Sequence, residues 1–101
     1  MAYKPRPGVT MLKICGVFLL APTRAATKEC PNVLQISPLG GMLWRLMEKG
    51  RGIQSLYLVY ASFTRKPDEE VEHDVGEYLG MLHKNGFLIE VPDEEADHDG
   101  A

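Results

Sequence analysis

The sequence has few cysteines and no long apolar run, and both scarcities narrow the classes of protein that it can encode. Its 101 residues include 2 cysteines, Cys15 and Cys30, which are too few for a disulfide scaffold and lack the close spacing of a zinc or redox pair. We expect a buried thiol on a strand and another in a loop. No run approaches the roughly 18 apolar residues of a membrane helix, which predicts a soluble protein without a membrane partner.

One N-terminal segment faintly imitates a secretory signal. Lys4 and Arg6 precede residues 14–21, which are mostly apolar. Lys13 directly abuts that segment, and Gly16 divides it in the manner of a strand boundary. We therefore interpret the segment as strands and expect a cytoplasmic protein.

Residues with catalytic or metal-binding potential are scarce and badly spaced. His73 and His83 lie ten residues apart on one expected helix, about three turns, and cannot share a metal ion. No nucleophile motif, phosphate-binding glycine loop or H-E-x-x-H motif occurs. Asp74 shares a helix side with Glu70 and Glu77, and a solvated face explains these acids more simply than acid–base chemistry does. An enzyme subunit acting through Asp74 lacks a nucleophile–base pair, so we expect no catalytic residue, metal or cofactor.

Length and charge indicate one domain with two unlike halves. The chain is 45% hydrophobic and 25% charged, as in ordinary globular proteins. Residues 1–66 have a net charge of +8 and residues 67–101 a net charge of −11. This split either orients a charged partner or lets two surfaces attract each other within the fold. We expect a single domain over residues 1–91 and a disordered acidic tail over residues 92–101.

Strand-forming residues gather in short segments near the N-terminus. Residues 9–15 and 17–21 flank Gly16 and predict two strands around a tight turn. A polar loop over residues 23–32 then leads to a third short strand over residues 33–36. Residues 87–91 have the composition of a final short strand.

Three helices are expected between the third and the final strand. Ser37-Pro38 is a capping residue followed by a proline suited to the first helical position, and Gly50 ends that first helix. The second helix covers residues 53–63. The third opens after Pro67, has acids in its first turn, and stops at Asn85-Gly86.

Glycines and aromatic residues in the helices indicate how these pack. Gly40 and Gly41 weaken the first helix but permit close approach of another backbone, such as a preceding strand. Trp44 and the tyrosines at 57, 60 and 78 lie among aliphatic residues at helical spacing. Core packing is therefore expected for them instead of a cofactor pocket.

The order of the elements predicts an α+β fold like a winged helix-turn-helix, with three N-terminal β-strands followed by three α-helices. DNA-binding modules of this kind usually carry a basic recognition helix. Here Lys84 is the only base of the third helix, and Arg51, Arg65 and Lys66 around the second helix are few. Nucleic acid is thus disfavoured as a partner, and a winged-helix DNA-binding or assembly factor is the alternative function.

Several blocks share their order and spacing with one known family. They are the strand end Ile36-Ser37-Pro38, Gly41, residues 42–47 around Trp44, Lys49-Gly50, the acid-rich residues 69–75, the spaced leucines that follow them, and residues 85–88. In these blocks residues 32–91 resemble the PqqD-like family, the RiPP recognition elements of ribosomal peptide maturation. No single block is specific. Two departures, Ser37-Pro38 and the long loop over residues 23–32, lie beside the expected binding edge.

The resemblance implies a non-catalytic peptide chaperone. Proteins of this family bind the leader peptide of a ribosomally synthesised precursor and present the precursor to a modifying enzyme, often a radical SAM protein. The leader adds as a strand to the edge of the third strand and lies against the third helix. Main-chain hydrogen bonds then supply affinity, and side-chain pockets supply specificity.

The resemblance also implies peptide-binding residues on two elements of this chain. They are Val33, Leu34, Gln35 and Ile36 on the strand, and Asp74, Glu77, Tyr78 and Met81 on the helix. Tyr78 and Met81 are expected to form an apolar pocket, because methionine adapts to varied side chains. Asp74 or Glu77 is expected to pair with a leader lysine or arginine. An exposed edge strand can also pair with a second copy, so a homodimer stays open.

Overall fold

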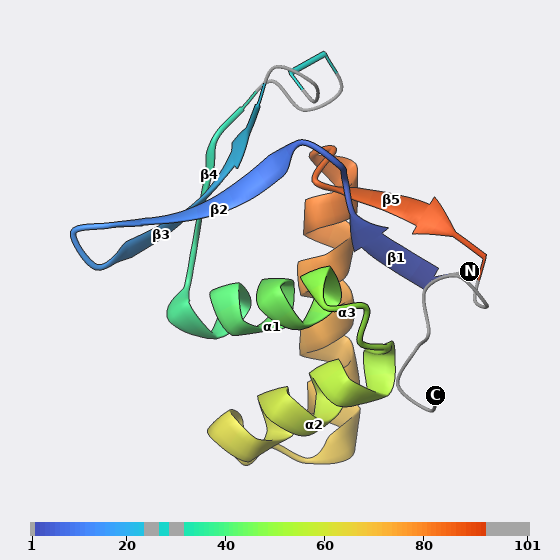
Figure 1. Cartoon of the computed structure of the whole chain (residues 1–101). Coiled ribbons are helices and arrows are strands. Elements are labelled where there is room, and N and C mark those ends of the chain that lie inside the picture. Colours follow the sequence, from blue (N-terminus) through green and yellow to red (C-terminus); the bar gives the residue numbers. More distant parts are fainter. Residues whose placement is uncertain (1, 24–26, 29–31, 93–101) are drawn as a thin grey trace.

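The computed structural model describes residues 2–23, 27–28 and 32–92 and has an α+β architecture (Figure 1). In chain order the elements are β1 (Ala2–Pro5), β2 (Val9–Ile14), β3 (Val17–Pro22), β4 (Leu34–Ile36), α1 (Pro38–Glu48), α2 (Ile53–Thr64), α3 (Asp68–Lys84) and β5 (Leu88–Val91). The expected winged-helix-like order of strands and helices is confirmed. The expected tail over residues 92–101 lies almost wholly outside the described residues. No helix in the described part of the chain combines the length and apolar character needed to cross a membrane.

Strand β1 was not predicted from the sequence and forms a two-stranded antiparallel ribbon with β5. The register places Tyr3 opposite Glu90. Arg6 extends this pairing, because its backbone N–H donates to the Phe87 carbonyl over 2.9 Å and its Nε donates to the Gly86 carbonyl over 2.6 Å. The ribbon thereby joins the start of the domain to the end of α3.

The remaining strands form an antiparallel sheet in the order β2-β3-β4. Figure 1 shows the β2–β3 hairpin reaching out beyond the helices. Cys15 and Gly16 form its turn with φ angles of 51° and 78°, as two-residue hairpin loops require. The predicted tight turn is confirmed, but the prediction of a buried thiol at Cys15 is wrong. The turn takes Cys15 out of the strand and exposes it, and Cys30 lies outside the described residues.

Helix α1 begins as predicted and lies close to the sheet. The Ser37 hydroxyl accepts a hydrogen bond from the Gly40 N–H over 3.0 Å, which satisfies a free amide of the first turn. A Cβ atom at Gly41 would lie 3.2 Å from the Phe18 ring and 3.3 Å from the Met11 sulfur. The expected close approach of the preceding strands is therefore present at Gly41.

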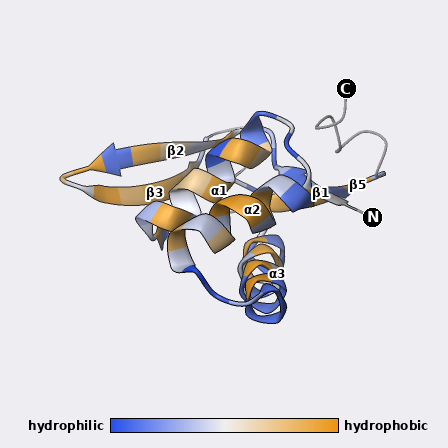
Figure 2. Ribbon diagram, turned by 90° about the horizontal axis from the view of Figure 1, so that it is seen from below, coloured by the Kyte–Doolittle hydropathy of each residue, from blue (hydrophilic) through white to orange (hydrophobic). Residues whose placement is uncertain are grey.

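One hydrophobic core joins the helices to both groups of strands. Its largest fully buried side chains are Trp44, Phe87, Leu20, Leu43, Leu82, Leu88 and Val75. The three tyrosines of α2 and α3 pack against this core as half-buried residues, which confirms the prediction of core packing for the aromatic residues. Figure 2 views α3 nearly along its axis, with hydrophobic residues on the side toward α1 and α2 and hydrophilic residues outward. The core therefore holds α3 in a fixed position relative to the sheet.

Candidate functional site

Strand β4 is an edge of the three-stranded sheet. It pairs with β3 on one side, with Leu34 opposite Leu20, Gln35 opposite Leu19 and Ile36 opposite Phe18. No strand within residues 2–23, 27–28 and 32–92 pairs with its other side. An edge of this kind presents backbone N–H and C=O groups that can pair with another extended chain.

The side chains around β4 differ in what they can offer a partner. Gln35 is exposed and Leu34 is half-buried against the core. Ile36 is only 7% exposed, so it is part of the core and can reach a partner through its backbone alone. Val33, which was predicted as part of the strand, lies just before it and is 60% exposed.

Tyr78 connects α3 to the end of this edge strand. Its hydroxyl donates a hydrogen bond of 2.8 Å to the carbonyl oxygen of Gly40, which lies in the first turn of α1 four residues after β4 ends. The ring lies so close that a Cβ atom at Gly40 would be 3.1 Å from the Tyr78 hydroxyl. Burial raises the pKa of Tyr78, so the phenol stays a hydrogen-bond donor. The structure thus brings one predicted helix residue next to the predicted strand.

Met81 lies on the same flank of α3 as Tyr78. The two are three residues apart, a spacing that places them on one side of a helix, and both are half-buried against the core. The pocket itself stays a prediction.

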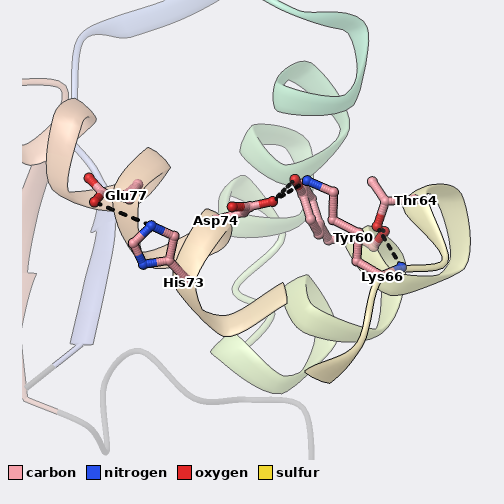
Figure 3. A network of polar contacts seen from close by, with 6 residues as sticks. All are labelled: Tyr60, Thr64, Lys66, His73, Asp74 and Glu77. Carbon is pink, nitrogen blue, oxygen red and sulfur yellow. Dashed lines mark hydrogen bonds and ion pairs between the residues drawn. The ribbon is translucent and has the colours of Figure 1, made fainter. Parts of the chain in front are cut away.

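Asp74 is held by two groups from the end of α2 and the loop that follows it (Figure 3). One carboxylate oxygen accepts hydrogen bonds of 2.6 Å from the Tyr60 hydroxyl and 2.6 Å from the Lys66 ammonium. These bonds, that of Lys66 first, lower the pKa of Asp74, and the same contact with Asp74 raises the pKa of Tyr60. Asp74 is therefore ionised at neutral pH and already has an internal cation.

Glu77 lies apart from this group. Its carboxylate is 72% exposed and 3.6 Å from the Nε2 atom of His73. In Figure 3 this pair lies on the other side of Asp74 from Lys66 and Tyr60. The structure therefore does not place the two acids predicted to bind a leader cation in one cluster.

Sequence reasoning missed three participants in this region, namely Gly40, Tyr60 and Lys66. Gly40 was recognised only as a site of close approach, not as the carbonyl that anchors Tyr78. Tyr60 and Lys66 were assigned to the core and to a weakly basic helix end. No periodic pattern links them to Asp74, because their contact depends on how α2 crosses α3.

The geometry offers little support for catalysis or metal binding at these residues. Across the described part of the chain, no three His, Cys, Asp or Glu side chains gather closely enough to hold a metal ion. An aspartate with a lowered pKa is also poorly suited to donate a proton at neutral pH. What the region does offer is a free strand edge beside an apolar flank of α3.

The fold and this region together define a winged-helix-like α+β domain with an exposed edge strand and a third helix tied to the first turn of α1. No family model and no curated protein matches the sequence. Two solved structures do match in fold, each with a TM-score of 0.72.

One of these structures is TbiB1 in complex with the TbiA(beta) leader peptide, at 18% identity over 89% of this chain and 99% of that chain. The other is lasso peptide synthetase B1 complexed with the leader peptide, at 13% identity over 89% of this chain and 100% of that chain. The chain therefore has the fold of these two proteins, in agreement with the fold that the PqqD-like resemblance implies.

Proposed function

We propose that this protein binds the leader segment of a ribosomally synthesised precursor peptide and presents the precursor to a modifying enzyme, without catalysing a reaction itself. The observation that carries the proposal is the free edge of β4, which leads directly into the first turn of α1, where Gly40 accepts the hydrogen bond from Tyr78 of α3. The fold shared with two leader-peptide complexes supports it.

In this proposal the leader binds as an extra strand on β4. Outward N–H and C=O groups of residues 34–36 pair with the leader backbone, which supplies affinity largely independent of sequence. Val33 and Gln35 are exposed and contact leader side chains. Tyr78 and Met81 provide the apolar contact from α3. The anchored phenol keeps this flank in place before binding, which lowers the entropic cost of association.

The two acids proposed to bind a leader cation, Glu77 and Asp74, are not equally available. Glu77 is exposed and its contact with His73 is long, at 3.6 Å, so a leader lysine or arginine can reach it more easily than a carboxylate held by Lys66 at 2.6 Å. At Asp74 a leader cation competes with Lys66, which already donates to the same carboxylate. We therefore assign the leader cation to Glu77 first and to Asp74 second.

For the modifying enzyme we propose a class of protein and not a particular one. A radical SAM enzyme is the partner that the family resemblance implies. This assignment places the protein in the cytoplasm. A homodimer formed through β4 would occupy the proposed site, so leader binding and self-pairing of this edge exclude each other.

The test is calorimetric titration of the protein with leader peptides of precursors encoded near its gene. We expect saturable one-to-one binding that weakens about tenfold or more in Gln35→Pro, because proline removes a donor and disturbs the edge. Gln35→Ala is the matched control and should bind within about threefold of the parent, since it keeps the backbone N–H. Circular dichroism establishes that both variants are folded. Binding of duplex DNA without binding of any leader would favour the winged-helix alternative and overturn the proposal.

A further inference from the structure

A groove lies between α2 and α3, away from β4. Its volume is about 210 Å³. The residues that matter for its chemistry are Tyr57, Leu58 and Ala61 on α2 and Asp68, Val71 and Glu72 on α3. Glu72 and Asp74 are two residues apart, which separates them by about 200° around the helix. The groove is lined by the first half of α3, whereas Tyr78 and Met81 of the proposed leader site lie in its second half.

The floor of the groove is apolar and open. Val71 is 2% exposed and closes its base, and Tyr57 and Ala61 are half-buried along its wall. Leu58 is 72% exposed beside them, so most of its apolar surface is left in water. An exposed leucine next to a hollow with an apolar floor is a feature of surfaces that receive an apolar side chain from a partner.

The rim of the groove is acidic. Asp68 and Glu72 are both exposed on α3. Neither forms an ion pair within the described residues, in contrast to Asp74, which Lys66 neutralises. Glu69, also exposed, adds a third carboxylate in the same turn of α3. Charge complementarity therefore favours a cationic partner.

We propose that this groove, named the α2–α3 groove, binds a cationic amphipathic helix of the modifying enzyme. Apolar side chains of that helix rest on Leu58 and Ala61, and its lysines or arginines lie beside Asp68 and Glu72. This inference rests on the proposed function, because a protein that presents a precursor to an enzyme needs one surface for the leader and a second surface for the enzyme. None of the residues that line the groove belongs to the proposed leader site, so leader and enzyme can be bound at the same time.

The probe is an amidated helical peptide of about 14 leucine and lysine residues with leucine at i, i+3, i+4 and i+7. A scrambled peptide of the same composition is the control. Titration into isotopically labelled protein should give saturable one-to-one binding with NMR shift changes concentrated at residues 54–61 and 68–72. The scrambled peptide should bind about tenfold more weakly or worse, because it presents no apolar face.

Two variants make the test specific. The first variant is Leu58→Ser and the second combines Asp68→Lys with Glu72→Lys. Each should weaken binding of the probe peptide about tenfold or more, whereas the affinity for the leader should stay within about twofold. Both alter exposed residues, so the fold should be retained. Equal binding of the scrambled peptide, no effect of either variant, or occupation of the groove by a second copy of the chain would overturn the inference. If leader binding fails while the probe binds the groove, the proposed function falls instead.

Discussion

Two sets of side chains on α3 differ in whether they have partners within the protein. On one flank, Tyr78 donates to Gly40 of α1 and Asp74 accepts from Lys66. On the flank toward the α2–α3 groove, Glu72 has no ion pair among the described residues and Leu58 is 72% exposed.

This difference separates two kinds of recognition. The edge of β4 offers main-chain N–H and C=O groups, which suits binding by strand addition. A flank with open charges and open apolar surface derives its affinity from a partner's side chains. In our two proposals, one helix contributes both to the leader site and to the enzyme site.

The largest expected contrast is in stability. Tyr78→Ala removes a ring packed against the core and its hydrogen bond, and should lower the free energy of unfolding by about 2–3 kcal/mol. Leu58→Ala on the open flank should change it by less than about 0.5 kcal/mol, because that side chain is mostly in water. Urea denaturation measures both. Equal losses from the two variants would contradict the division of α3 into a packed and an open flank.

A smaller effect on stability isolates the hydrogen bond between α3 and the first turn of α1. Tyr78→Phe keeps the ring but leaves the Gly40 carbonyl without its donor, which should lower the free energy of unfolding by about 1 kcal/mol. Because the ring remains, the leader should still bind, with a modest loss from a less ordered flank. Denaturation and leader titration of the same variant measure the two effects. An unchanged stability would show that the hydrogen bond does not anchor the helix.

The outward face of α3 should tolerate a stabilising change. A Cβ atom at Gly76 or at Gly80 would meet no other atom within 4 Å. Each glycine-to-alanine substitution should therefore raise the free energy of unfolding by about 0.5–1 kcal/mol, through the higher helix propensity of alanine. Thermal unfolding of Gly76→Ala and Gly80→Ala tests this, and neither should affect leader or probe binding. A loss of stability would mean that this face is covered by another part of the protein.

The smallest effect concerns the pH dependence of the Asp74 contact. The folded-state pKa of Asp74 lies below the ordinary value of 3.8, so its stabilisation is present above that value and is lost as the pH falls through the folded pKa. Asp74→Asn should therefore be less stable than the parent near neutral pH, and the difference should shrink in the acid range. Denaturation at several pH values measures it, with Glu77→Gln as a control for removing one charge. A difference that grows with acidification would contradict the assigned contact.

Local patterns in the sequence predicted much of this fold. Ser37 was recognised as a cap and Gly16 as part of a turn, since both features depend on neighbours within a few residues. The apolar spacing of the three helices likewise predicted their order and approximate bounds.

Features that depend on distant partners were missed. Strand β1 includes a proline and pairs with β5, which lies at the other end of the chain, so no local pattern indicates it. The contact of Asp74 with Tyr60 and Lys66 likewise exists only once α2 crosses α3. The family resemblance therefore named Asp74 as a binding residue, but it did not reveal that Lys66 already neutralises this acid.

The most direct test of the central claim is residue-level amide hydrogen exchange with and without a bound leader peptide. Strand addition predicts that at least one amide of β4, which spans Leu34–Ile36, becomes strongly protected in the complex, because its N–H then donates to the leader. Amides lining the α2–α3 groove should keep their exchange rates. A leader that binds without protecting β4, or that protects the groove instead, would contradict the account.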